Sequence, residues 1–238
     1  MIKKVLVGMG IIGMGMLPCL SFAQSVQEFT QEVFGLQLGD SYEHISQTHR
    51  LAADETRPKE SKSQMYGIML ETPEIDGAPV YKVATLIFYE NRLAEISVSY
   101  LNREDVMVQL RSNLIKRLGK PTNVESMDMS VSNDKKNIET SYIWTEGDMQ
   151  AVFNSASLSE VPNNLILFSY MPLSEKFVIE QAISYAHLLK ESAASKAAFE
   201  EMIRKNSSYR EQIKKQMENY PEYAAALRDS GVDMTIFD

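Results

Sequence analysis

The chain offers few residues for catalysis or metal binding, and its three histidines, His44, His49 and His187, are far apart in the sequence. His44 lies one helical turn after Asp40, so the two could share a helix face, whereas His49 is five residues further on and points elsewhere. The H-E-x-x-H spacing that places two histidines on one helix face is absent. A metal site made of Asp40, His44, His49 and Asp54 would require the chain to fold back on itself. We therefore predict no metal or cofactor site.

Residues 34–41 read FGLQLGDS. This block resembles the opening block of GDS-type (SGNH) esterases, and the resemblance implies that Ser41 is the nucleophile of a small secreted hydrolase. The later blocks depart from the family pattern, because Asn133 lacks the preceding glycine and Ser184 stands where aspartate should precede His187. A serine without a nearby base is a weak nucleophile. We expect Ser41 to take part in capping a helix, and we keep the hydrolase as the alternative function.

Residues 128–139 read DMSVSNDKKNIE and have the length and the acidic ends of a calcium-binding loop. Asn133 occupies the sixth position, where such a loop needs glycine, and Lys135 follows shortly after it. We predict a solvated loop here.

The first 23 residues have the three parts of a secretory signal peptide. Lys3 and Lys4 form a basic tip, residues 5–17 are uncharged and apolar, and a small-residue end closes at Ala23. The spacing of Gly8, Gly10 and Gly13 also resembles the dinucleotide-binding fingerprint of Rossmann proteins. Pro18 would stop the helix that this fingerprint requires, and no alternation of strand and helix follows. We predict residues 1–23 to be a signal peptide and the mature chain to begin near Gln24.

Export and cysteine content together predict the compartment. Cys19 is the only cysteine and lies within the predicted signal peptide, so the mature chain would have no disulfide. In a lipoprotein Cys19 would instead be the acylated first residue, but Pro18 replaces the small residue expected before it. These features favour a periplasmic protein, with release from the cell as the alternative.

The composition is acidic, with 32 Asp and Glu against 24 Lys and Arg, and a formal net charge of −8. Such a chain without a basic stripe is a poor ligand for nucleic acid or for an anionic membrane surface. No apolar stretch after residue 23 is long enough to cross a membrane. We therefore expect neither nucleic-acid binding nor a stable membrane span after signal cleavage.

Residues 24–172 are predicted to form an α+β domain. A short helix is expected at residues 26–34, a strand near 64–71 and a hairpin at 81–101, where alternating apolar residues can face a core. Seven residues of this hairpin are expected on the buried face: Ala84, Leu86, Phe88, Ala94, Ile96, Val98 and Tyr100. A second helix from Asn102, with an apolar stripe ending at Leu118, precedes a hairpin at 140–155 and a strand at 164–170.

The order of a helix followed by three strands thus occurs twice, which suggests a tandem repeat. In this element order alone the chain resembles β-lactamase inhibitor proteins and small outer-membrane assembly lipoproteins. The strands are expected to form one antiparallel sheet with flanking helices.

Residues 173–238 contain no strand pattern and are predicted to form an all-helical extension. Ser174 and Ser195 are expected to open helices, Asn206 to interrupt them and Pro221 to start the last one. Their apolar stripe comprises Phe199, Ile203, Tyr209, Ile213, Met217 and Tyr220. It could pack within the chain or bind a partner, because short helices are marginal alone. We predict a non-enzymatic interaction protein, an inhibitor or an envelope-assembly accessory, that binds another protein or itself through these helices.

Overall fold

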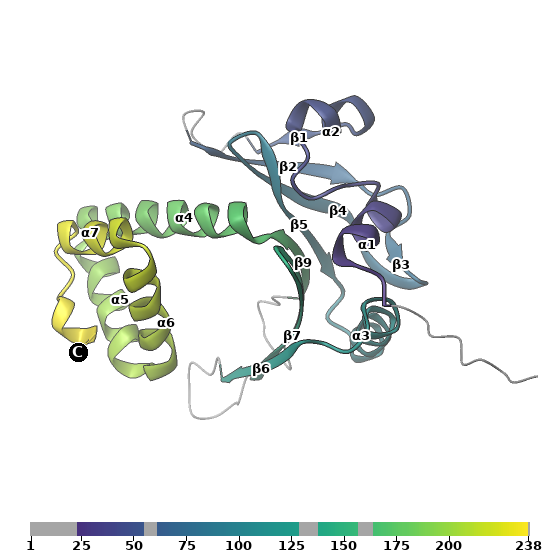
Figure 1. The fold of residues 1–238 in the computed structure, drawn as a ribbon. Helices are drawn as coiled ribbons and strands as arrows, with labels where there is room; N and C mark the ends of the chain where they lie inside the picture. Colours follow the sequence, from purple (N-terminus) through teal and green to yellow (C-terminus); the bar gives the residue numbers. More distant parts are fainter. Residues whose placement is uncertain (1–22, 55–60, 129–137, 157–163, 238) are drawn as a thin grey trace, which may run out of the picture.

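The computed structural model describes residues 23–54, 61–128, 138–156 and 164–237, and it has an α+β fold (Figure 1). Within these residues, nine strands form an antiparallel sheet in the order β1-β2-β4-β5-β9-β8-β7-β6, with β3 paired to β4. The predicted fold class is confirmed. The signal peptide with its glycine fingerprint lies outside the described residues, as does most of the calcium-loop candidate.

The strands are β1 (Ala52–Ala53), β2 (Ser63–Met69), β3 (Glu74–Ile75), β4 (Ala78–Tyr89), β5 (Arg92–Tyr100), β6 (Asn123–Asp128), β7 (Ile138–Glu146), β8 (Met149–Ala156) and β9 (Leu165–Tyr170). The helices are α1 (Val26–Phe34), α2 (Tyr42–Thr48), α3 (Glu104–Leu118), α4 (Met171–Glu191), α5 (Ala193–Lys205), α6 (Ser207–Asn219) and α7 (Pro221–Asp229), followed by the short 3-10 helix η1 (Met234–Phe237).

The α+β part is built from two similar halves that meet where β5 pairs with β9. Each half contributes four strands outward from this pair: β5, β4, β2 and β1 on one side, and β9, β8, β7 and β6 on the other. With β3 on β4, the first half has five strands and the second has four, and the prediction of three strands per unit was wrong. The two-residue β1 and the polar β6 are both too weakly patterned to be recognised as strands.

Two helices cover one face of this sheet, and each packs on the other half's strands. α1 packs on β8, and α3 packs on β4. α1 begins with a capping box, in which Ser25 Oγ accepts from the Glu28 N–H at 3.1 Å and Glu28 Oε2 accepts from the Ser25 N–H at 3.0 Å. Phe29 of α1 stacks on Phe168 of β9 with ring centroids 5.4 Å apart, which joins this helix to the centre of the sheet.

The hairpin of β4 and β5 departs from simple alternation. Ala84, Leu86 and Phe88 face the main core as predicted, but Ala94 lies on the opposite face, and Leu93 takes the core position. A register shift in the pairing between Ile87 and Phe88 causes this, because an extra residue in one strand reverses the side-chain alternation.

The C-terminal helices lie on the other side of the sheet (Figure 1). α4 follows β9 directly and packs across β5 and β4, where Leu173 and Phe177 form a small cluster with Ile87, Tyr89 and Ala94. Ser174 was predicted to cap this helix. Its hydroxyl instead donates to the buried Glu95 of β5, while the helix begins at Met171.

The outer part of α4 and the helices α5 to α7 share their own core. Ser192 caps α5 and Asn206 caps α6, each through a side-chain oxygen that accepts a backbone N–H. The apolar stripe of the extension packs inside: Phe199, Ile203 and Ile213 are buried, and Tyr209, Met217 and Tyr220 are partly buried against them. No helix in the described parts of the chain is both long and apolar enough to span a bilayer.

Candidate functional site

Ser41 is the N-cap of α2. Its Oγ accepts the backbone N–H of His44 at 3.2 Å, and Ser41 itself has the extended backbone of an N-cap residue. The imidazole of His44 is turned to Asp40, with Nε2 3.8 Å from Oδ2. The histidine that the esterase pattern would use as its base, His187, lies on α4, and the Ser41 oxygen is engaged in capping α2.

The predicted metal candidates do not converge. His49 Nδ1 lies 2.9 Å from the Thr48 hydroxyl, and its Nε2 lies 3.3 Å from the Phe34 carbonyl oxygen. The ring thus packs against the end of α1 and away from His44. His187 is exposed on α4. In the described part of the chain, no three His, Cys, Asp or Glu side chains are grouped as metal ligands would be.

A cavity of about 910 Å³ lies at the β2 edge of the sheet. We call it the edge groove. It lies between the end of α1, the segment that enters β1 and the end of β2. Its lining residues are Glu32, Val33, Phe34, Gly35, Thr48, His49, Arg50, Ala52, Gly67, Ile68, Met69, Leu70, Glu71, Thr72 and Val83.

The groove exists because β1 covers only part of β2. β1 pairs with β2 at Ala52 opposite Gly67 and at Ala53 opposite Tyr66. Met69 lies opposite Val83 of β4, and the next residue, Leu70, donates its N–H to the Lys82 carbonyl of β4. Because the backbone groups of successive residues in a strand point to opposite sides, the N–H and C=O of Met69 point away from β4. Arg50 would be the next residue to pair there, yet it makes no backbone hydrogen bond to Met69. This short stretch of edge is open for pairing.

Exposed apolar side chains lie beside this open edge. Met69 is 59 % exposed and Val83, its partner on β4, is 50 % exposed. Tyr81, two residues before Val83 on the same strand, is also exposed. On the core side of the groove, Ile68 and Leu70 are buried. An extended chain laid along Met69 would thus find backbone partners together with an apolar contact surface.

Polar groups surround the groove with both signs of charge. Arg50 lies on the β1 side, Glu71 follows β2, and Glu32 on α1 pairs with Arg117 at 2.9 Å. Such a rim suits a neutral or mixed-charge segment better than a strongly charged one.

The sequence alone did not identify this site. The strand near residues 64–71 was predicted, but β1 was not, and only the pairing of β1 shows that Met69 is left uncovered. No motif marks the position.

The predicted partner surface on the helical extension is mostly used within the chain. Four large apolar side chains of α4 and α5 remain exposed: Val178, Tyr185, Leu188 and Met202. Tyr185 also contacts Phe199 edge to face at 6.0 Å, so part of this surface supports the bundle core.

No protein-family model, no curated protein and no solved structure matches this chain.

Proposed function

We propose that the protein is an exported, non-enzymatic interaction protein that binds an extended segment of another polypeptide in the edge groove. The observation that carries this proposal is the open backbone of Met69 beside the exposed side chains of Met69 and Val83. Adding a strand at a sheet edge gives affinity through main-chain hydrogen bonds and specificity through alternate side chains.

The other edge of the sheet is a weaker candidate. β6 is the outer strand there; it exposes Val124, but Asn123, Glu125 and Ser126 beside it are polar or charged. Charged and polar side chains on an edge strand discourage pairing with another chain. The contrast with Met69 supports the β2 edge as the binding edge.

The expected occupant is short. Between the start of β1 and the turn at Thr72, whose carbonyl accepts the Glu74 N–H at 2.9 Å, only Met69 and Glu71 occupy outward-facing positions, because the Leu70 N–H is bonded to Lys82. Such a segment would form few main-chain hydrogen bonds, so the apolar contacts must supply much of the affinity. We expect dissociation constants on the order of micromolar for isolated peptides.

The predicted signal peptide supports a partner in the periplasm or outside the cell. The helical extension remains a second surface, for self-association or another protein, because Leu188 and Met202 stay exposed. The hydrolase alternative has less support, since Ser41 caps α2 and His187, the histidine of the esterase pattern, is exposed on α4.

The proposal is tested by panning displayed peptide libraries on the purified mature protein and measuring the selected peptides by fluorescence polarisation. Met69→Pro removes the N–H that must donate, at an edge position where proline is tolerated. Val83→Glu alters the apolar surface. Val108→Glu is the matched control, since Val108 is equally exposed on α3.

We expect peptides with alternating apolar residues, loss of at least about tenfold in affinity for the two edge variants and no change for Val108→Glu. Hydrogen exchange of the Met69 amide should slow when peptide binds. A failure to select any peptide, or peptides that bind Met69→Pro as tightly as the wild type, would overturn the proposal.

A further inference from the structure

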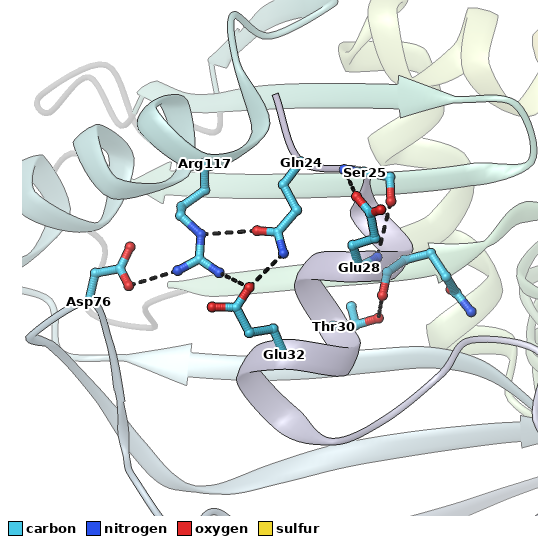
Figure 2. Close-up of polar contacts among 8 residues, drawn as sticks. Gln24, Ser25, Glu28, Thr30, Glu32, Asp76 and Arg117 are labelled. Carbon is cyan, nitrogen blue, oxygen red and sulfur yellow. Dashed lines mark hydrogen bonds and ion pairs between the residues drawn. The ribbon is translucent and has the colours of Figure 1, made fainter. Parts of the chain in front are cut away.

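The start of the mature chain contacts the C-terminal end of α3 through its backbone and its side chain. The backbone N–H of Gln24 donates to the carbonyl of Arg117, in the last turn of α3, at 2.8 Å. The Arg117 Nε donates to Gln24 Oε1 at 3.0 Å, and Gln24 Nε2 donates to Glu32 Oε2 at 2.8 Å (Figure 2). The side-chain amide of Gln24 is thus held at both its oxygen and its nitrogen.

Arg117 is itself fixed from three directions. Its Nη1 donates to Asp76 Oδ1 at 3.0 Å, and its Nη2 lies 2.9 Å from Glu32 Oε2 (Figure 2). Its guanidinium also lies over the ring of Phe29, 5.3 Å from the centroid. Only a fifth of this side chain is exposed. A guanidinium held in this way is a rigid donor for Gln24.

We infer that the chain is processed between Ala23 and Gln24, and that the fold holds the new N-terminal glutamine in a conformation that protects it from cyclisation. The first part rests on the proposed export of the protein. After cleavage the backbone N–H of Gln24 becomes an ammonium group beside a carbonyl at a helix C-terminus, where the helix dipole favours a positive charge.

An N-terminal glutamine can close on itself to form pyroglutamate. The α-amino nitrogen attacks the side-chain Cδ, an N–Cδ bond forms, the Cδ–Nε2 bond breaks, and Nε2 leaves as ammonia after taking up a proton. The side chain must fold back over its own nitrogen for this attack. In the structure the backbone nitrogen is bonded to the Arg117 carbonyl, and the amide oxygen and nitrogen are held by Arg117 and Glu32, so the attack requires these bonds to break.

The native state should therefore cyclise at least about tenfold more slowly than the same chain in urea, because both hydrogen bonds of the amide must break before attack. The gene is expressed with its own signal peptide, the protein is purified from the periplasm, and N-terminal sequencing and intact mass are recorded over time at neutral pH. Loss of one ammonia reports cyclisation.

Arg117→Gln should raise the native rate toward the urea rate. Glu32→Ala should do so in part, and its exposed position makes a folding defect less of a concern. Arg111→Gln, which changes the same charge on α3 at a residue that contacts Tyr142, should behave as wild type. A first residue other than Gln24, equal rates in buffer and urea, or wild-type rates in both Arg117→Gln and Glu32→Ala would each overturn the inference. Peptide binding in the edge groove does not enter any of these measurements.

Discussion

Replacing Ser41 by alanine separates the capping role of this serine from a catalytic one. The substitution removes the oxygen that accepts the His44 N–H and leaves that donor without its protein partner. Loss of a serine N-cap costs about 1 kcal/mol, within a range of about 0.5–2 kcal/mol. For a domain of this size, about 1 kcal/mol lowers Tm by roughly 2–4 °C.

Neighbouring contacts argue for the lower part of that range. The chain on either side of Ser41 is tied to the start of β5: the Gly39 N–H donates to the Leu93 carbonyl, the Leu93 N–H to the Asp40 carbonyl and the Tyr42 N–H to the Asn91 carbonyl. These bonds remain when the cap is lost. The seven-residue α2 should fray at its first turn without the sheet unfolding.

Thermal and urea unfolding of four proteins test this reasoning. Ser41→Asn keeps a good cap but has no hydroxyl, so it should retain near wild-type stability. Ser25→Ala removes the equivalent cap of α1 and should cost a similar amount. Ester hydrolysis is measured in parallel. Equal destabilisation by Ser41→Asn and Ser41→Ala would refute the capping argument, and hydrolysis by the wild type that both variants lose would support the hydrolase.

Two further predictions concern the contact between α4 and the sheet. Phe177 packs on Tyr89 and Ala94, so Phe177→Ala should destabilise the protein by about 3 kcal/mol. Hydrogen exchange in the first half of α4 should become faster, and unchanged exchange there would contradict this prediction. Burial raises the pKa of the Glu95 carboxyl, so the folded state favours the protonated form. The contribution of the protonated carboxyl to stability is fully present below the pKa of the unfolded chain, and it is lost as the pH rises through the pKa of the folded protein. Glu95→Gln, which imitates the protonated form, should therefore raise the free energy of unfolding, measured in urea, by about 1 kcal/mol near neutral pH and leave it unchanged near pH 4. A loss of stability at neutral pH would show that the fold prefers the charged form.

Elements with strong local signals could be predicted from the sequence. The capping box and Gly35 place α1 at Val26–Phe34, and the stripe of Val106, Leu110, Leu114 and Leu118 gives the buried face of α3. In both cases the information lies within a few residues of the element. Spacing and caps are sufficient there, because they act before any tertiary contact forms.

Features that depend on distant contacts could not be predicted in this way. Tyr89 and Glu95 were not among the residues expected to be buried, yet both are buried because α4, which begins at residue 171, packs over β4 and β5. Likewise, a register shift in the pairing of β4 with β5 places Ala94 on the other face, and no local sequence signal predicts this shift. The open edge at Met69 belongs to the same class, since it depends on where β1 stops.

The repeat suggests why the groove lies where it does. β1 and β6 occupy equivalent places outside β2 and β7, but β6 pairs with β7 over six residues whereas β1 pairs with β2 over two. A β1 strand of six residues would pair with β2 at Met69, just as β6 pairs with β7 over six residues. The proposed binding edge is thus a position that one half of the sheet covers and the other leaves open. Lengthening β1 to close it should stabilise the sheet and abolish peptide binding together.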